Sequence, residues 1–134
     1  MKKLFLLLLL SPLVCFSQLD IGKTKSQIKS KFSYKPCEEG QKTLMYCSSD
    51  GNMIGYVFAN NMCESVQFYT VYSSKYKADI ELEKAINSFG QENNETPITR
   101  GGATSFIGVN GVGVTFSVIQ FKGSHYVRQI YQAY

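Results

Sequence analysis

The chain has 134 residues and a formal net charge of +4, with 14 basic and 10 acidic residues. This length suits one domain with one modest hydrophobic core. The basic residues are spread along the chain and form no dense block, which argues against a nucleic-acid partner, because such proteins normally carry a concentrated basic footprint.

Residues 1–17 have the three-part pattern of a secretory signal peptide. Two lysines precede an apolar run at residues 4–10, and the small Ser17 stands just before a polar residue. The apolar run is shorter than the ~20 residues that span a bilayer, so the pattern predicts cleavage after Ser17 and no transmembrane segment. We therefore expect a secreted or periplasmic protein whose mature chain, residues 18–134, forms a single α+β domain.

Cys15 leaves a second form of processing open, because bacterial lipoproteins are cleaved just before a cysteine that receives lipid. That cleavage favours a small residue immediately upstream, whereas Val14 stands there. Cleavage after Ser17 fits the preference for small residues better. Lipidation of Cys15 would instead give an anchored protein.

Three cysteines remain in the mature chain: Cys37, Cys47 and Cys63. In an oxidising compartment one pair is expected to form a disulfide, and three pairings are open. If tight turns join the expected strands, Cys47 and Cys63 are offset by about four residues on different strands, which exceeds disulfide reach. Cys37 can meet either one, and we favour Cys37–Cys47, with Cys63 as a buried thiol. A reactive or dimer-forming Cys63 is the alternative.

The first half of the mature chain predicts a helix and then a meander. Residues 24–32 have helical spacing, and Thr24 with Gln27 forms a capping box at the start. The residue before Pro36 is disfavoured in a helix, so the helix ends before it. Three strands rich in β-branched and aromatic residues are expected next, at residues 43–48, 53–59 and 62–72.

The second half repeats this order. A helix is expected at residues 75–89, capped by Ser74 and closed by Gly90, followed by strands at 103–109, 112–122 and 125–132. Asn110-Gly111 is the strongest hairpin signal in the chain, and Gly123-Ser124 is a second turn. Each half is thus a helix plus three strands, which suggests an internal duplication (18–72 and 73–134). The expected fold is an antiparallel sheet with its helices packed on one face.

Alternation in the second meander separates two faces. The better core face carries Ile107, Val109, Val112, Val114, Phe116 and Val118. The other face mixes aromatic and polar residues, which is the composition of a contact surface. We expect Phe106, Phe121, Tyr126 and Arg128 on that surface. The alternative is that a helix or loop covers it.

No motif for catalysis or cofactor binding stands out. Gly22-Lys23-Thr24 resembles the end of a phosphate-binding loop but lacks the upstream glycine and strand. His125 is the only histidine, and no nucleophile elbow or orienting acid stands near it in the sequence. The cysteines lack paired zinc-ligand spacing. We expect no cofactor, no metal and no enzymatic activity, although dispersed carboxylates leave a glycosidase-type pair open.

Residues 22–28 (Gly-Lys-Thr-Lys-Ser-Gln-Ile) resemble the opening of small envelope domains, the SmpA/OmlA-type outer-membrane assembly lipoproteins and the β-lactamase inhibitor proteins. The resemblance implies a repeated helix-then-meander fold and a habit of binding proteins. A cysteine after the first helix bonded to one on the following strand would also resemble the inhibitor family. The chain departs from the lipoproteins at the lipidation site and at the exit of the first helix. The second unit has no Gly-x-Thr opening, so the resemblance transfers no target.

These observations favour an exported, non-enzymatic module that binds a protein or an envelope component. Two alternatives are a small secreted hydrolase with a dispersed active site, and a periplasmic immunity or inhibitor protein with one specific partner.

Overall fold

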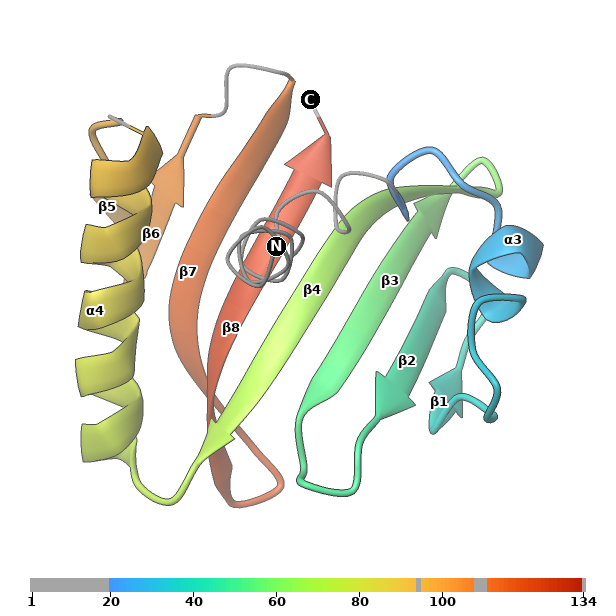
Figure 1. Cartoon of the computed structure of the whole chain (residues 1–134), viewed down its shortest axis with the longest axis horizontal. Helices are drawn as coiled ribbons and strands as arrows, with labels where there is room; N and C mark the ends of the chain where they lie inside the picture. The colour runs from blue at the N-terminus through green and yellow to red at the C-terminus, as the bar shows by residue number, and fades with distance from the viewer. Residues whose placement is uncertain (1–19, 94, 108–110, 134) are drawn as a thin grey trace, which may run out of the picture.

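An eight-stranded antiparallel sheet forms the body of the fold (Figure 1). The structure is a computed structural model and describes residues 20–93, 95–107 and 111–133. The strand order is β1-β2-β3-β4-β8-β7-β6-β5, and all neighbouring strands are antiparallel. The predicted α+β class with an antiparallel sheet and two helices is therefore confirmed. The predicted signal peptide lies outside the described residues.

Each half of the described chain contains one helix followed by four strands. The elements in chain order are α3 (Lys25–Lys29), β1 (Glu38–Glu39), β2 (Thr43–Cys47), β3 (Met53–Ala59), β4 (Met62–Tyr72), α4 (Lys75–Asn93), β5 (Ile98–Arg100), β6 (Ala103–Phe106), β7 (Val112–Phe121) and β8 (Ser124–Ala133). The last strands of the two halves, β4 and β8, pair at the centre of the sheet. The shared element order agrees with an internal duplication, which stays a prediction.

The helix α3 begins as predicted and ends earlier than predicted. The hydroxyl of Thr24 accepts a hydrogen bond from the backbone N–H of Gln27 at 3.2 Å, and the Gln27 side chain accepts one from the Thr24 N–H at 2.9 Å. Ser30, the C-cap, donates its hydroxyl to the Gln27 carbonyl and competes with further helical bonding. The chain then turns and stacks Phe32 on Tyr46, with ring centroids 3.6 Å apart.

The helix α4 runs past the glycine that was expected to close it. Ser74 caps the start as predicted, because its hydroxyl accepts a hydrogen bond from the Lys77 N–H at 3.2 Å. Gly90 lies inside the helix, which continues to Asn93. A Cβ at position 90 would lie 3.4 Å from Cε1 of Phe106. Gly90 therefore lies where the helix approaches the sheet, and an added Cβ would meet the Phe106 ring at about contact distance.

Two hairpin turns use residues with positive φ. Asn60 (φ 50°) and Asn61 (φ 63°) form the predicted turn between β3 and β4. The turn between β7 and β8 lies one residue earlier than predicted, at Lys122 (φ 49°) and Gly123 (φ 79°). Consecutive positive φ angles are typical of the tight turns that match the twist of a hairpin.

One buried cluster lies beneath α3. Its members are Ile28, Leu44, Tyr46, Tyr56, Phe58, Cys63 and Val66. Ile28, the buried residue of α3, is 0% exposed. Burying side chains of this size contributes about 1.5–3 kcal/mol each, so this cluster accounts for much of the stability of the first half.

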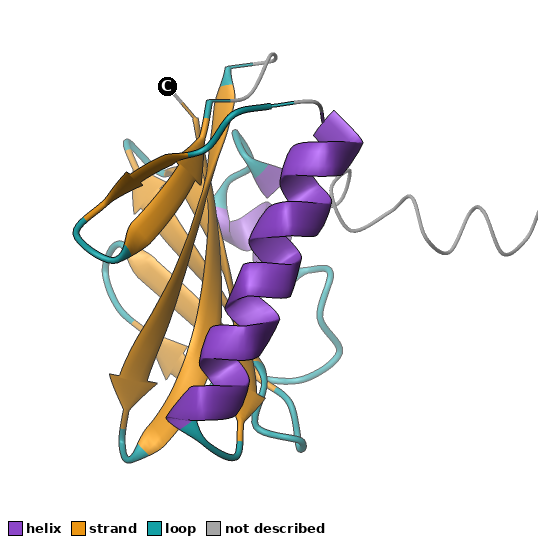
Figure 2. Ribbon diagram, turned by 90° about the vertical axis from the view of Figure 1, so that its left-hand side faces the viewer, coloured by secondary structure: helices purple, strands orange, loops and turns teal. Residues whose placement is uncertain are grey.

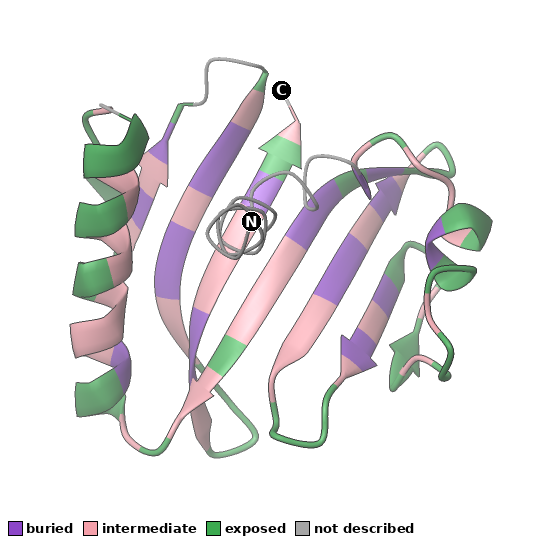
Figure 3. Ribbon diagram, in the orientation of Figure 1, coloured by how far each residue is buried: buried purple, intermediate pink, exposed green. Residues whose placement is uncertain are grey.

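A second buried cluster lies beneath α4, which runs along the sheet (Figure 2). Its members are Phe106, Val114, Phe116 and Tyr131, packed against Leu82, Ala85, Ile86 and Phe89 of the helix. Ile21 and Phe68 pack against both clusters. Buried residues recur along β3, β4 and β7 in Figure 3, and the larger ones, Tyr56, Val66 and Phe116, belong to the two clusters.

The register of β6 on β7 corrects the predicted core face. A two-residue turn at Asn110-Gly111 would place Ile107 opposite Val114. Instead Phe106 pairs with Val114, so β6 is shifted by one residue and every side chain on it faces the other way. Phe106 is 1% exposed in the core, and Ile107 is 63% exposed. Asn110 and Val109 lie outside the described residues.

The buried Asp20 carboxylate links the segment before α3 to the sheet through a hydrogen bond from Tyr56 of β3. Asp20 is 3% exposed and accepts hydrogen bonds from Lys31 Nζ at 2.5 Å, Lys23 Nζ at 3.2 Å and the Tyr56 hydroxyl at 3.2 Å. Burial and the neighbouring Asp20 carboxylate raise the pKa of Tyr56 far above its ordinary value, so its hydroxyl stays protonated and available as a donor.

The disulfide favoured from the sequence is present. Cys37 and Cys47 are bonded, with their Cα atoms 5.8 Å apart, and Cys63 is a buried free thiol. The bond joins the segment that follows α3 to β2 next to the short edge strand β1. It therefore fixes one edge of the sheet.

Asp20→Ala should lower the free energy of unfolding by about 2 kcal/mol. The substitution leaves the buried Tyr56 hydroxyl without its hydrogen-bond acceptor and removes the ion pairs with Lys23 and Lys31. The lysines are about a third exposed, which reduces the loss. The matched control Asp79→Ala removes an exposed ion pair with Lys75 and should cost less than about 0.5 kcal/mol. Equal losses of unfolding free energy for the two variants in urea would show that the buried Asp20 contacts do not stabilise the fold.

Reduction of the disulfide should lower the free energy of unfolding by about 3 kcal/mol, because a cross-link that closes a short loop restricts the unfolded chain. The double variant Cys37→Ser/Cys47→Ser should reproduce this loss in urea unfolding without reductant. A double variant as stable as the oxidised protein would contradict the structural role of the bond.

Candidate functional site

The residues that alternate with the core residues define a second face of the sheet, which we call the open face. Its central row crosses all eight strands and consists of Glu38, Met45, Gly55, Gln67, Ile130, Thr115, Ser105 and Ile98. The adjacent row consists of Cys47, Met53, Tyr69, Arg128 and Ser117. Most of these side chains are partly exposed. The open face therefore mixes aromatic, aliphatic, uncharged polar and charged groups.

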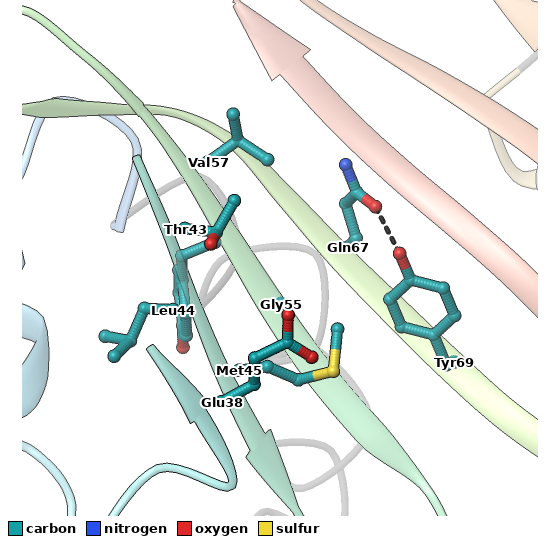
Figure 4. A pocket seen from close by; sticks show the side chains of 9 residues that line it. Glu38, Thr43, Leu44, Met45, Gly55, Val57, Gln67 and Tyr69 are labelled. Atoms are coloured by element: carbon teal, nitrogen blue, oxygen red, sulfur yellow. Dashed lines mark hydrogen bonds between the residues drawn. The ribbon is translucent and has the colours of Figure 1, made fainter. Parts of the chain in front are cut away.

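A shallow hollow of about 120 Å³ lies over β2, β3 and β4 on this face (Figure 4). Gly55 makes room for it, because a Cβ there would contact Met45 Cε and Tyr69 Cε2, each at 3.6 Å. The Tyr69 hydroxyl donates to the side-chain oxygen of Gln67. Glu38 and Thr43 complete the rim.

A larger hollow of about 450 Å³ lies at the other end of the face, over β5, β6, β7 and the end of β8. Ile98 and Ile107 line it and are 45% and 63% exposed. Ser105 and Thr115 line it as well, and their hydroxyls lie 2.9 Å apart. Arg100 adds a positive charge. The hollow therefore combines exposed aliphatic groups with a cation.

Two tyrosines and an arginine form the centre of the open face. Arg128 is the cross-strand neighbour of Tyr69 and of Ser117, to whose hydroxyl its Nε donates at 3.3 Å. The rings of Tyr69 and Tyr126 meet edge to face with centroids 6.4 Å apart. Tyrosine and arginine are over-represented among residues that dominate protein interfaces.

The residues predicted to form a contact surface are divided by the structure. Phe121, Tyr126 and Arg128 lie on the open face, where Phe121 is 44% exposed, Arg128 is partly exposed and Tyr126 is 8% exposed. Phe106 lies in the core beneath α4, so its placement on the surface was wrong; the one-residue shift of β6 is the cause.

The sequence reasoning missed the part of the open face contributed by the first half of the chain, including Met45, Gly55, Gln67 and Tyr69. The alternation of β4 carries the signal, because Gln67 and Tyr69 alternate with Val66 and Phe68. That alternation could have been read as two faces in the same way as in the second meander.

The structure places His125, the one histidine, away from both hollows. His125 pairs with Tyr72 and Gln120 and lines neither hollow of the open face. Within residues 20–93, 95–107 and 111–133, no three His, Cys, Asp or Glu side chains are grouped so that they could hold a metal ion. No described helix has both the length and the apolar character needed to cross a membrane.

Cys63, the second residue of β4, is buried. Its Sγ lies 3.4 Å from the Ser65 carbonyl oxygen, and burial raises the pKa of the thiol to about 11. The thiolate is the nucleophilic form, so this pKa makes Cys63 unreactive near neutral pH.

Comparisons with protein-family models, curated proteins and solved structures give no significant match.

Cys63 in the folded protein should react with iodoacetamide at pH 8 at least about tenfold more slowly than in the urea-unfolded protein, because of its burial and raised pKa. Mass spectrometry of timed alkylation measures both rates. Labelling as fast in the folded protein as in the unfolded protein would contradict this description of Cys63.

The raised pKa of Cys63 in the folded protein also makes the free energy of unfolding fall as pH rises from about 9 toward 11, since the thiol of the unfolded chain loses its proton first.

Proposed function

We propose that the protein is an exported, non-enzymatic binding module whose open face recognises another protein or an envelope component. The observation that carries the proposal is the composition of this face: partly exposed Tyr, Met, Ile and Arg side chains on β2, β3, β4, β5, β7 and β8, with two hollows. Such a surface is typical of interface centres.

The placement of the helices supports this assignment. Ile28 of α3 packs against Leu44 and Tyr56, and α4 packs against Val114 and Tyr131. The register joins these strand residues in one row, Leu44–Tyr56–Val66–Tyr131–Val114. We infer that both helices lie on one face and leave the open face to a partner.

Export is part of the proposal. The pattern at residues 1–17 is that of a signal peptide. The Cys37–Cys47 disulfide supports an oxidising compartment such as the periplasm or the extracellular space, because such bonds are rare in reducing ones.

The matched variants Tyr69→Ala and Tyr76→Ala test the proposal. Tyr69 lies at the centre of the open face, whereas Tyr76 is 73% exposed on α4. With the mature protein as bait in an envelope extract, we expect Tyr69→Ala to reduce the captured partner about tenfold or more, because central aromatic side chains dominate interfaces. Tyr76→Ala should capture as much as the unaltered protein.

Circular dichroism and thermal unfolding check that both variants remain folded. Equal capture by the two variants would contradict the assignment of the open face. No captured partner, together with turnover of a substrate in a hydrolase screen, would favour the enzyme alternative.

A further inference from the structure

The two arginines of the chain, Arg100 and Arg128, both belong to the open face. Every ion pair among the described residues is made by a lysine, and the lysines involved lie in or beside the two helices. The guanidinium of Arg128 makes a side-chain hydrogen bond to the neutral hydroxyl of Ser117. The described part of the chain therefore presents two guanidinium groups without a carboxylate partner on one surface.

The register places the two arginines in line across the sheet. Arg128 pairs with Ser117, and Arg100 pairs with Ala103. Because Thr104 pairs with Phe116, Ala103 lies opposite Ser117 on the neighbouring strand. The two arginines therefore lie in one row, separated by three strand spacings. At a strand spacing of about 4.8 Å, their backbones are about 14 Å apart. An extended peptide covers about 13 Å in four residues, so residues i and i+4 of such a segment match this separation.

The charge on the open face is unevenly distributed. Glu38, the acidic residue of its central row, lies on β1 at one edge, while Arg100 lies on β5 at the opposite edge. Between the arginines, the row carries a serine hydroxyl, and the neighbouring hollow offers Ile98 and Ile107. A guanidinium binds a carboxylate through two parallel hydrogen bonds, which an ammonium cannot do.

On the basis of the proposed function, we propose that the partner is a protein whose docking segment is acidic and extended, with two carboxylates about four residues apart that pair with Arg128 and Arg100. The aliphatic side chains of the segment occupy the hollow beside Ile98 and Ile107. Charge complementarity selects the partner, and the partly exposed Tyr69 at the centre of the face supplies apolar contact.

A labelled synthetic peptide tests this inference. The probe is a fluorescein-labelled, amidated peptide with two glutamates four positions apart and valine and threonine between them; the control peptide has glutamine at both positions. Fluorescence anisotropy should show binding of the glutamate peptide to the mature protein at least about tenfold tighter than binding of the control. Raising the salt to 0.5 M should weaken it.

Protein variants locate the contact. Arg128→Gln and Arg100→Gln should each raise the Kd about tenfold, and Arg128→Lys should raise it less, because it keeps the charge and loses the paired hydrogen bonds. Lys84→Gln removes one exposed positive charge from α4 and should leave the Kd unchanged. Amide chemical-shift changes on peptide addition should fall on β4, β5, β7 and β8.

Three outcomes would overturn the inference: no binding of the glutamate peptide, binding mapped to the lysines of α3, or equal binding of the two peptides. If the two peptides bind equally and both change the amide chemical shifts of the open face, the proposed binding function still holds. Only the preference for carboxylates is then wrong. Loss of the proposed function would appear separately, as equal capture by the Tyr69→Ala and Tyr76→Ala variants.

Discussion

The antiparallel pairing of β4 with β8 is the contact on which the rest of the structure depends. It joins the two halves of the described chain and sets Val66 opposite Tyr131, so that the clusters beneath α3 and α4 share one row of core residues. Because side chains alternate along a strand, the same pairing aligns Gln67 with Ile130 and Tyr69 with Arg128. One register therefore builds both the core and the open face.

Two stabilising interactions lie in the first half of the described chain. The buried Asp20 carboxylate holds the start of the described chain against Tyr56, and the disulfide closes the β1–β2 edge. Much of the open face itself consists of uncharged polar groups, half-exposed aromatics and two arginines, which add little to a core. Partly exposed side chains that add little to the core are free to contact a partner, which supports the proposed binding function.

Much of the fold follows from local patterns in the sequence. The predicted ranges of β3 and β4, the caps at Thr24 and Ser74 and the disulfide all agree with the structure, because alternation, capping and register are short-range signals. The two-residue β1 and three-residue β5 could not be predicted from local patterns, since strands this short form only by pairing with a neighbouring strand.

The errors arise where packing overrides local signals. Gly90 looks like a helix end but lies inside α4, next to the ring of Phe106. The Asn110-Gly111 dipeptide predicts a two-residue turn, yet β6 pairs one residue away from the register that such a turn would impose. That single shift moves Phe106 from the predicted contact surface into the core. In the structure Phe89 of α4 packs against Phe106 and Phe116, a contact between distant segments that local sequence patterns do not reveal.

Site-specific photo-cross-linking in intact cells tests most directly whether the open face is the surface that binds a partner. A photoreactive phenylalanine derivative would replace Gln67 or Ile130 on the open face, and Tyr76 or Glu83 on the exposed side of α4. We expect adducts of one discrete mass from the first two positions and none from the other two. Adducts from α4 without adducts from the open face would contradict the assignment of the open face as the binding surface.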